Sequence, residues 1–314
     1  MNDKREPRTH TRSAALLGEG VIWDWRNERL LWVDAESHGY YCSERGEPER
    51  TSWHEAGFFV SSIALVGPRG EALLLTTEKG LAAVEHPGAP LGFGPKRIHA
   101  ISVDYDAEAL RMNDSVADPL GRLWVGTMAW DGSEAVGTLY CYESPEEFTR
   151  RKERMTIPNG MGFSPEGAWF YLTDSGAAAI YRYPFSPSSS AYSEKERLPE
   201  VDPFIDTSAD TGVPDGLAVS RDGSIFSARW GGSRVVHYDS MGREIGTLPM
   251  PARQPSSCAF GGPGLGTLYV SSARTGLDEA SQEESSEGDL FMVPGISVGR
   301  EEQVLSEAFL QLLE

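Results

Sequence analysis

The chain has 314 residues, with 28 Lys and Arg against 47 Asp and Glu, so its formal net charge at pH 7 is -19. So acidic a chain is repelled by nucleic acid and by anionic membrane surfaces, and we expect neither as a partner, whereas a cation is a natural ligand. No stretch approaches the ~20 apolar residues that a membrane-spanning helix needs. Solubility alone also explains much of the charge.

The N-terminus and the cysteines both favour a cytoplasmic protein. The start, MNDKREPRTHTRS, is charged and lacks the apolar segment of a secretory signal. We expect residues 1–12 to be a disordered arm and residues 13–314 to be a single domain. The cysteines, Cys42, Cys141 and Cys258, have neither the spacing of a zinc site nor the density of a disulfide framework, and we predict buried thiols.

One pattern of β-rich runs recurs six times along the chain. In each repeat a strand-like run follows a turn rich in Gly, Asp, Asn or Pro, and another β-rich run comes after a short gap. The repeats begin near Gly18, Ser61, Asn113, Asn159, Asp215 and Ser257. Their intervals of roughly 42 to 56 residues are close to the length of a four-stranded propeller blade. The sequence therefore predicts an all-β fold, a six-bladed β-propeller whose blades stack in a ring.

Three segments depart from the repeat. Residues 276–288, GLDEASQEESSEG, are acidic and polar, and we expect an exposed loop within the last blade. Residues 185–200 form an insertion rich in Ser and Pro. The tail, VLSEAFLQLLE, is compatible with a short helix or with a strand that completes a blade.

Polar residues at equivalent places in several repeats are the candidates for a functional site. The innermost strand of each propeller blade lines a central channel, so side chains at the entry of these strands converge at one end. These positions hold Glu19 in LLGEGVIWD, Asn113 in RMNDSVAD, Asn159 in IPNGMGFSP, Asp215 in VPDGLAVSRDG and Ser257 in PSSCAFGG.

Three of these residues, Glu19, Asn159 and Asp215, each precede a glycine and an apolar strand. Two carboxylates and one amide oxygen suit a divalent cation such as Ca²⁺, Mn²⁺ or Mg²⁺, and Zn²⁺ also accepts carboxylate ligands. Asn-Gly and Asp-Gly dipeptides also occur simply as turn formers. The match of three positions in three repeats favours a metal site in which water completes the coordination.

Residues near these positions are candidates for the substrate pocket. Arg111 lies two residues before Asn113, so both point to the same side of an extended segment, where the arginine could bind an anionic or hydroxyl-rich substrate. A surface salt bridge is the alternative role of this arginine. Ser62, Trp130 and Asp131 are weaker candidates for shaping the pocket. The histidines show no ligand spacing, and there is no GxSxG elbow or phosphate-binding loop.

Taken together, these segments resemble the family of the senescence marker protein, also called regucalcin, and of the bacterial gluconolactonases. The shared elements are GEGVIWD, RMNDSVADPLGRLWVGTM, IPNG, VPDG, ARWGGSRVVHYD and PSSCAFGG…LYVSSARTGLD, in the same order. The resemblance covers roughly residues 15 to 295. It implies a six-bladed propeller that holds one divalent metal and hydrolyses a small sugar lactone to the aldonic acid.

The resemblance also implies roles for single residues. The metal ligands would be Glu19, Asn159 and Asp215. Arg111 and Asn113 would contact the sugar hydroxyls, and Asp131 stands where family members can place a substrate-contacting glutamate. The metal would act as a Lewis acid on the lactone carbonyl, while Asp215 would also serve as the general base for the attacking water.

Two other functions are compatible with the same scaffold, because a propeller fold alone does not determine the chemistry. One is a different metal-dependent ester or organophosphate hydrolase, although the polar side chains of Arg111, Asn113 and Asp131 favour a sugar substrate. The other is a non-enzymatic calcium-binding propeller, in which the metal is structural or regulatory.

Overall fold

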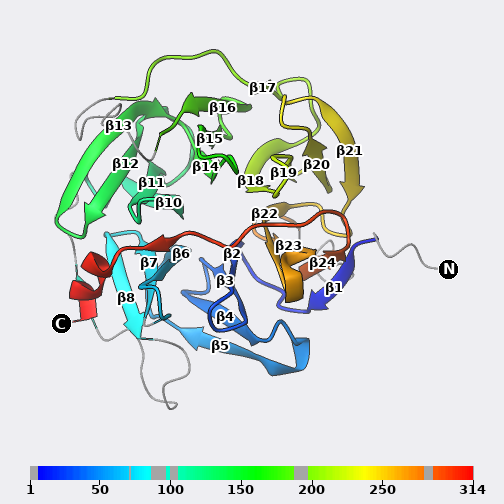
Figure 1. Ribbon diagram of the computed structural model, residues 1–314, viewed down its shortest axis with the longest axis horizontal. Coiled ribbons are helices and arrows are strands. Elements are labelled where there is room, and N and C mark those ends of the chain that lie inside the picture. The colour runs from blue at the N-terminus through cyan, green and yellow to red at the C-terminus, as the bar shows by residue number, and fades with distance from the viewer. Residues whose placement is uncertain are drawn as a thin grey trace.

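The computed structural model describes residues 6–70, 72–85, 97–99, 105–186, 197–278 and 286–313. Within these residues the chain forms six β-sheets that are arranged as blades around a central axis (Figure 1). Five sheets have four strands and one has five. The predicted six-bladed β-propeller is therefore confirmed. None of the helices in the described part of the chain is long and apolar enough to cross a membrane.

The first three blades follow the chain from the axis outward. The first contains β2 (Gly18–Asp24), β3 (Arg29–Asp34), β4 (Gly39–Glu44) and β5 (Thr51–Glu55), with the 3₁₀ turn η1 (Pro48–Arg50) before β5. The second contains β6 (Val60–Val66), β7 (Ala72–Thr77), β8 (Leu81–Glu85) and β9 (Arg97–His99). The third contains β10 (Leu110–Ala117), β11 (Leu123–Ala129), β12 (Gly137–Ser144) and β13 (Glu147–Met155).

The other three blades repeat this order. The fourth contains β14 (Pro158–Phe163), β15 (Trp169–Asp174), β16 (Ala179–Pro184) and β17 (Ile205–Asp206). The fifth contains β18 (Val213–Val219), β19 (Ile225–Trp230), β20 (Arg234–Tyr238) and β21 (Glu244–Pro249). The sixth contains β22 (Pro255–Gly261), β23 (Thr267–Ser272), β24 (Leu290–Pro294) and β1 (Arg8–Thr11), with the 3₁₀ turn η2 (Pro263–Leu265) after β22.

The hydrophobic core lies between the blades. Six clusters of buried side chains occur among the described residues, and each joins two neighbouring blades around the ring. The apolar runs of the second and third strands supply most of these side chains, such as Leu74 and Val125 between the second and third blades. Each blade therefore depends on its neighbours to bury its two faces. The three cysteines are buried in these clusters as free thiols, as predicted.

The prediction of a disordered arm at residues 1–12 is wrong for its second half. Arg8–Thr11 form β1, which pairs with β24 as the outermost strand of the sixth blade. His10 is buried there; its Nε2 donates to the carbonyl of Gly46 at 2.8 Å, and its ring packs edge-on against Tyr269. Polar residues are compatible with an outer strand, because one of its faces and one of its edges lie toward solvent. Residues 1–5 lie outside the described residues.

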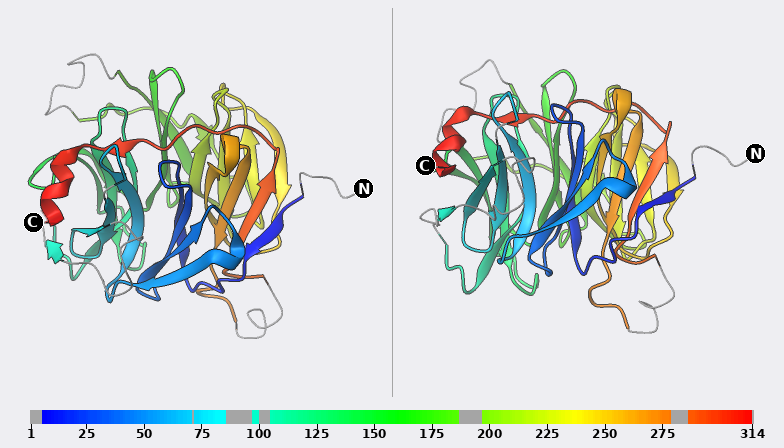
Figure 2. Two further views of the ribbon diagram at one scale, coloured as in Figure 1. Left: turned by 60° about the horizontal axis from the view of Figure 1, so that its bottom comes forward. Right: turned by 90° about the horizontal axis from the view of Figure 1, so that it is seen from below.

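The C-terminal segment crosses one end of the ring (Figures 1 and 2, red). From β24 it runs to β25 (Val304–Leu305), which pairs in parallel with β6, and to the 3₁₀ helix η3 (Glu307–Leu313). On the way, the carbonyl of Val298 accepts from the N–H of Arg221, and Arg300 donates to the carbonyl of Phe163 at 3.0 Å. The tail is thus both a strand and a helix, and it covers the ends at which the inner strands finish.

Two predicted loops lie partly outside the described residues, at 187–196 and at 279–285. The insertion at 185–200 joins β16 to β17. Within the loop predicted to be exposed at 276–288, Glu287 is instead buried, and its carboxylate accepts the N–H of Arg253 at 2.9 and 3.0 Å. This end of the loop is therefore part of the sixth blade's packing.

Candidate metal and substrate site

All six inner strands are irregular near the end where they begin. Their pairing with the second strand shifts register between Glu19 and Ile22, Val60 and Ser62, Met112 and Ser115, Asn159 and Met161, Pro214 and Leu217, and Pro255 and Cys258. A β-bulge redirects the side chains around it and is common beside functional sites. The irregularities therefore lie near the starts of all six sequence repeats, and five of them are at or next to the polar residues singled out above.

The glycine that follows each predicted metal ligand allows neighbouring inner strands to approach closely. A Cβ atom on Gly160 would lie 2.5 Å from the carbonyl oxygen of Asp215, and one on Gly216 would lie 2.6 Å from the Cα of Ser257. Gly20 has a positive φ of 53°, which glycine adopts without steric cost. These polar-Gly pairs lie inside strands β2, β14 and β18 rather than in hairpin turns. The interpretation of the pairs as turn formers is therefore wrong.

A chain of hydrogen bonds connects the third, fourth and fifth blades around the site. Arg111 Nη1 donates to Asn113 Oδ1 at 2.6 Å, and Asn113 Nδ2 donates to Asn159 Oδ1 at 3.2 Å. Asn159 Nδ2 donates to Ser175 Oγ at 3.1 Å, and this hydroxyl donates to the carbonyl of Pro214 at 2.6 Å. Because the Ser175 proton is already used, its oxygen must accept from the amide. The Asn159 oxygen is thereby held facing Asn113.

The carboxylates of Glu19, Asp114 and Asp215 are concentrated at the start of the inner strands, with few hydrogen-bond donors around them. Asp215 is only 3% exposed, and its Oδ1 has no hydrogen-bond partner. Burial, and then the charge of Asp114, raises the pKa of Asp215 well above its ordinary value. Burial, and then the charges of Asp215 and Asp114, likewise raises the pKa of Glu19. The positive charge of Arg111 lowers this pKa, but by less than the other effects raise it. Burial raises the pKa of Asp114 to about 6.

These residues fit a divalent cation. The unpartnered oxygen of Asp215, the carboxylate of Glu19 and the amide oxygen of Asn159 are the hard donors that such cations bind. A cation would also relieve the repulsion between carboxylates that share one buried site. No group of three or more His, Cys, Asp and Glu residues placed to hold a metal occurs in the described ranges. A metal site here would therefore include an oxygen that does not belong to a carboxylate, and the amide oxygen of Asn159 is such a donor.

A cavity of about 650 Å³ opens at the end of the ring where the inner strands begin. Among the residues that line it are Leu17, Glu36, Phe59, Glu108, Arg111 and Trp130. Arg111 belongs both to this cavity and to the hydrogen-bond chain, so it links the cavity to the predicted metal ligands. The structure thus places Arg111 beside Asn113 and Asn159.

Asp131, Ser62 and Ser257 lie in other surroundings. Asp131 is exposed, and its Oδ1 accepts from the N–H and the hydroxyl of Ser133 at 3.0 and 2.8 Å. It is not among the residues that line the 650 Å³ cavity, whereas its neighbour Trp130 is. The predicted contact of Asp131 with substrate stays a prediction. Ser62 and Ser257 line a separate cavity of about 110 Å³ farther along the channel.

That inner cavity lies between the bulged residues and the C-terminal segment. It is lined by Asp114 and Ser115 on one side and by Arg300 and Glu302 on the other. Burial raises the pKa of Glu302 to about 7, the Arg300 charge lowers it, and the Asp114 charge adds to the increase. Asp114 and Ser175 were not predicted as site residues. Asp114 directly follows Asn113, and Ser175 follows a second strand rather than an inner one, so neither stands out in the repeat.

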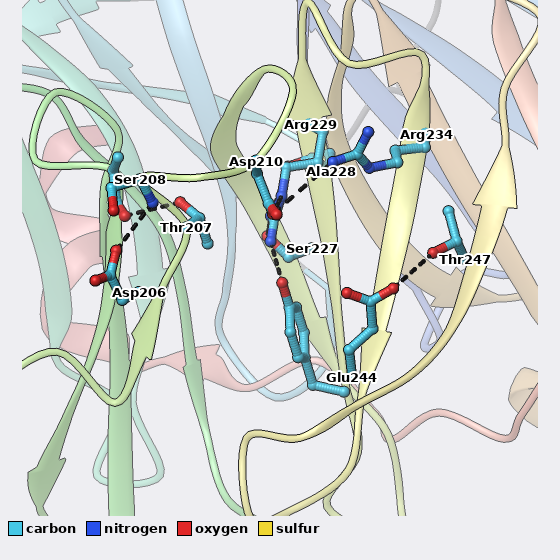
Figure 3. Close-up of polar contacts among 12 residues, drawn as sticks. Asp206, Thr207, Ser208, Asp210, Ser227, Ala228, Arg229, Arg234, Glu244 and Thr247 are labelled. Carbon is cyan, nitrogen blue, oxygen red and sulfur yellow. Dashed lines mark hydrogen bonds and ion pairs between the residues drawn. The ribbon is translucent and has the colours of Figure 1, made fainter.

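Arg229 supports the segment that leads into the Asp215 strand (Figure 3). It is fully buried, and its Nε donates to Asp210 Oδ2 at 3.2 Å, while its Nη1 donates to Ser227 Oγ at 2.5 Å. Its Nη2 also donates to the hydroxyl of Tyr238. Arg229 lies opposite Pro214 in the sheet register. The buried guanidinium therefore ties the loop at Asp210 to the strand that carries Asp215.

The raised carboxyl pKa values predict how the stability of the metal-free protein depends on pH. A carboxyl whose pKa is higher in the folded state binds more protons there, so stability is present at low pH and is lost as pH rises through the folded pKa. This window begins at about pH 4, the ordinary pKa of a carboxyl group. It ends at about pH 6 for Asp114 and at about pH 7 for Glu302. We expect the melting temperature in chelator to fall as pH rises across this window.

Thermal unfolding between about pH 4.5 and about pH 8, followed by circular dichroism, measures this dependence. The double variant Asp114→Asn, Glu302→Gln should show a shallower decline, because two of the groups no longer titrate. A melting temperature that stays constant or rises over the window would contradict the assignment.

The amino-acid sequence is similar to a known family and to several named proteins. The sequence profile of the SMP-30/Gluconolactonase/LRE-like region matches residues 17–274. A protein named pentonolactonase XacC from Haloferax volcanii is 36% identical over 292 residues, which cover 91% of this chain and 93% of that protein. An L-arabinolactonase from Azospirillum brasilense is 31% identical, with 88% of this chain and 87% of that protein covered.

A solved structure agrees with these similarities. The structure of a calcium-binding protein, regucalcin, from Agrobacterium tumefaciens superposes with a TM-score of 0.83 and 26% identity. The comparison covers 95% of this chain and 96% of that one. The resemblance inferred from the sequence motifs is thereby confirmed, and the expected lactonase-type enzyme agrees with the names of the two sequence relatives.

Proposed function

Because the chain belongs to the SMP-30/gluconolactonase/LRE-like family, we propose that it hydrolyses a small sugar lactone to the aldonic acid with one divalent cation bound by Glu19, Asn159 and Asp215. The observation that carries this proposal is the buried oxygen of Asp215, which has no hydrogen-bond partner and lies near Glu19, a second carboxyl whose pKa is raised. Arg111 joins this site to a large cavity. Relatives named for their action on pentonolactone and on L-arabinolactone support the substrate class.

The cation would supply electrostatic activation of the lactone carbonyl and of a water molecule. Ca²⁺, Mn²⁺, Mg²⁺ and Zn²⁺ all suit the ligand set, and the calcium-binding structural neighbour supports a divalent ion. In the reaction, the water oxygen bonds to the carbonyl carbon and its proton passes to the Asp215 carboxylate. The ester bond to the ring oxygen then breaks, and this oxygen takes up the proton to give the hydroxy acid.

Arg111 and Asn113 would hold the sugar in the orientation for attack. The Arg111 guanidinium is fixed by its bonds to Asn113 Oδ1 and to the carbonyl of Met112 at 3.1 Å. A donor that is already ordered loses little entropy when it binds a hydroxyl group, and correct orientation of the reacting atoms lowers the barrier. The polar side chains of Arg111 and Asn113 favour a hydroxyl-rich sugar over an apolar ester. A cytoplasmic location and the absence of nucleic-acid and membrane partners belong to this proposal as predictions from the sequence.

The proposal is tested by acid release in a pH-stat from five- and six-membered sugar lactones, with an aryl ester and an organophosphate as competing substrates. We expect turnover of sugar lactones to fall at least about 100-fold in EDTA and to return with one of the four cations, because the cation stabilises the developing negative charge. Turnover of the ester or organophosphate alone would favour the other hydrolase. Chelator-sensitive melting without turnover would favour the calcium-binding protein.

A further inference from the structure

Trp130 is an exposed aromatic side chain at the proposed substrate cavity. It is 43% exposed and lines the cavity of about 650 Å³ together with Arg111. A large apolar side chain left open to solvent loses the stabilisation of burial, and such residues mark binding surfaces when they lie in a concave site beside polar groups. The exposed indole ring of Trp130 is therefore a surface that a ligand in the cavity would cover.

The turn that carries Trp130 is held by several hydrogen bonds. The indole Nε1 and the backbone N–H of Trp130 donate to the carbonyls of Ala107 and Ala109, both at 3.4 Å. On the far side of the turn, Asp131 Oδ1 accepts the two hydrogen bonds from Ser133. The carboxylate of Asp131 thus stabilises the turn that presents the indole toward the cavity.

Trp130 also packs around the arginine that joins the cavity to the site. The ring of Phe59 meets it at an angle of 72°, with 5.3 Å between ring centroids. The Arg111 guanidinium carbon lies 4.9 Å from the Phe59 ring centroid and 5.7 Å from that of Trp130. Two aromatic rings therefore flank a guanidinium that is only 9% exposed. An apolar wall and a hydrogen-bond donor stand side by side on one surface of the cavity.

We propose that Trp130 is a substrate-contacting residue whose exposed indole packs against the apolar C–H face of the sugar lactone while Arg111 and Asn113 bind its hydroxyls. This inference rests on the proposed function. A sugar ring has apolar C–H edges as well as hydroxyls, and the electron-rich face of an aromatic ring attracts such partly positive hydrogens. Contact with the ring would cover the exposed indole and would select carbohydrate lactones that present both a C–H face and hydroxyl groups.

The test compares Trp130→Ala with Trp130→Phe in steady-state kinetics on the preferred lactone. We expect KM to rise about 10-fold in Trp130→Ala, which corresponds to about 1.4 kcal/mol of binding free energy, with kcat changed by less than about 3-fold. Trp130→Phe should recover most of the affinity because a stacking ring remains. Trp53→Ala is the matched control: Trp53 is 40% exposed on the outer strand β5, and its removal should change neither constant.

A second readout is direct binding of the aldonate product. It should quench the intrinsic fluorescence of the wild-type protein more strongly than that of Trp130→Phe, while Trp53→Phe should behave as the wild type does. An unchanged KM in Trp130→Ala, or a fall in kcat alone, would overturn the proposal, the latter because it would mean that the indole only positions Arg111. Both readouts require that the wild-type protein hydrolyses lactones. If the wild type shows no turnover, the proposed function itself is wrong, and this result is distinct from a failure of the Trp130 proposal.

Discussion

Replacement of Asp215 by asparagine should lower kcat/KM for the lactone by at least about 1,000-fold, because it would remove both a proposed charged metal ligand and the proposed general base. Asparagine has nearly the same shape, and Asp215 is only 3% exposed, so the buried volume is preserved. The change should also stabilise the metal-free fold at neutral pH, since one of the carboxylates that repel each other is gone. Kinetics and calorimetric metal titration of the same preparation measure these effects.

The matched control for this variant is Asp289→Asn. Asp289 is also buried, and burial raises its pKa to about 6, but it lies in the sixth blade next to the backbone of Ala14. Its replacement should leave kcat/KM and metal affinity within about 3-fold of the wild type, a change of less than about 1 kcal/mol. Full activity and unchanged metal affinity in Asp215→Asn would remove this residue from the mechanism.

Replacement of Arg229 by methionine should reduce the free energy of unfolding by about 3 kcal/mol, because several hydrogen bonds of a fully buried guanidinium are lost together. The change leaves the hydroxyls of Ser227 and Tyr238 without their buried donor and frees the loop at Asp210. Because Arg229 faces Pro214 in the register of the Asp215 strand, metal affinity should decrease as well. Urea unfolding and metal titration give the two quantities.

Arg234→Met provides the comparison for Arg229→Met. Arg234 also faces Asp210, but at 3.9 Å, and its side chain is 24% exposed. An ion pair in contact with solvent contributes about 0–1 kcal/mol, so this variant should be close to the wild type in stability and metal affinity. If both variants lost the same free energy of unfolding, the charge of Asp210, rather than the buried hydrogen-bond network of Arg229, would determine the stability of this region.

The six blades could be recognised from sequence because they form a regular repeat, and the predicted metal ligands were singled out because they occupy one position of that repeat. Glu19, Asn159 and Asp215 each precede a glycine, and in these three blades the glycine is required because neighbouring inner strands approach closely. A periodic pattern of this kind is visible in a single chain without knowledge of its partners.

Features that depend on distant partners were not predictable in the same way. β1 pairs with β24 across some 280 residues of sequence, and its polar residues, Arg8–Thr11, gave no sign of a strand. The tail becomes both strand and helix because β6 and the core of the second and third blades are available to it. Similarly, family resemblance assigns a role to position 131, but only the turn geometry shows that Trp130 lines the cavity while Asp131 bonds to Ser133.

The location of the bound cation is the most direct test of this account. Crystals soaked with Mn²⁺ and measured for anomalous scattering should show one strong peak at the axis, about 2.0–2.6 Å from oxygens of Glu19, Asn159 and Asp215, as expected for divalent cations with oxygen ligands. A peak at any other group of residues, or a central peak without these three ligands, would contradict the account.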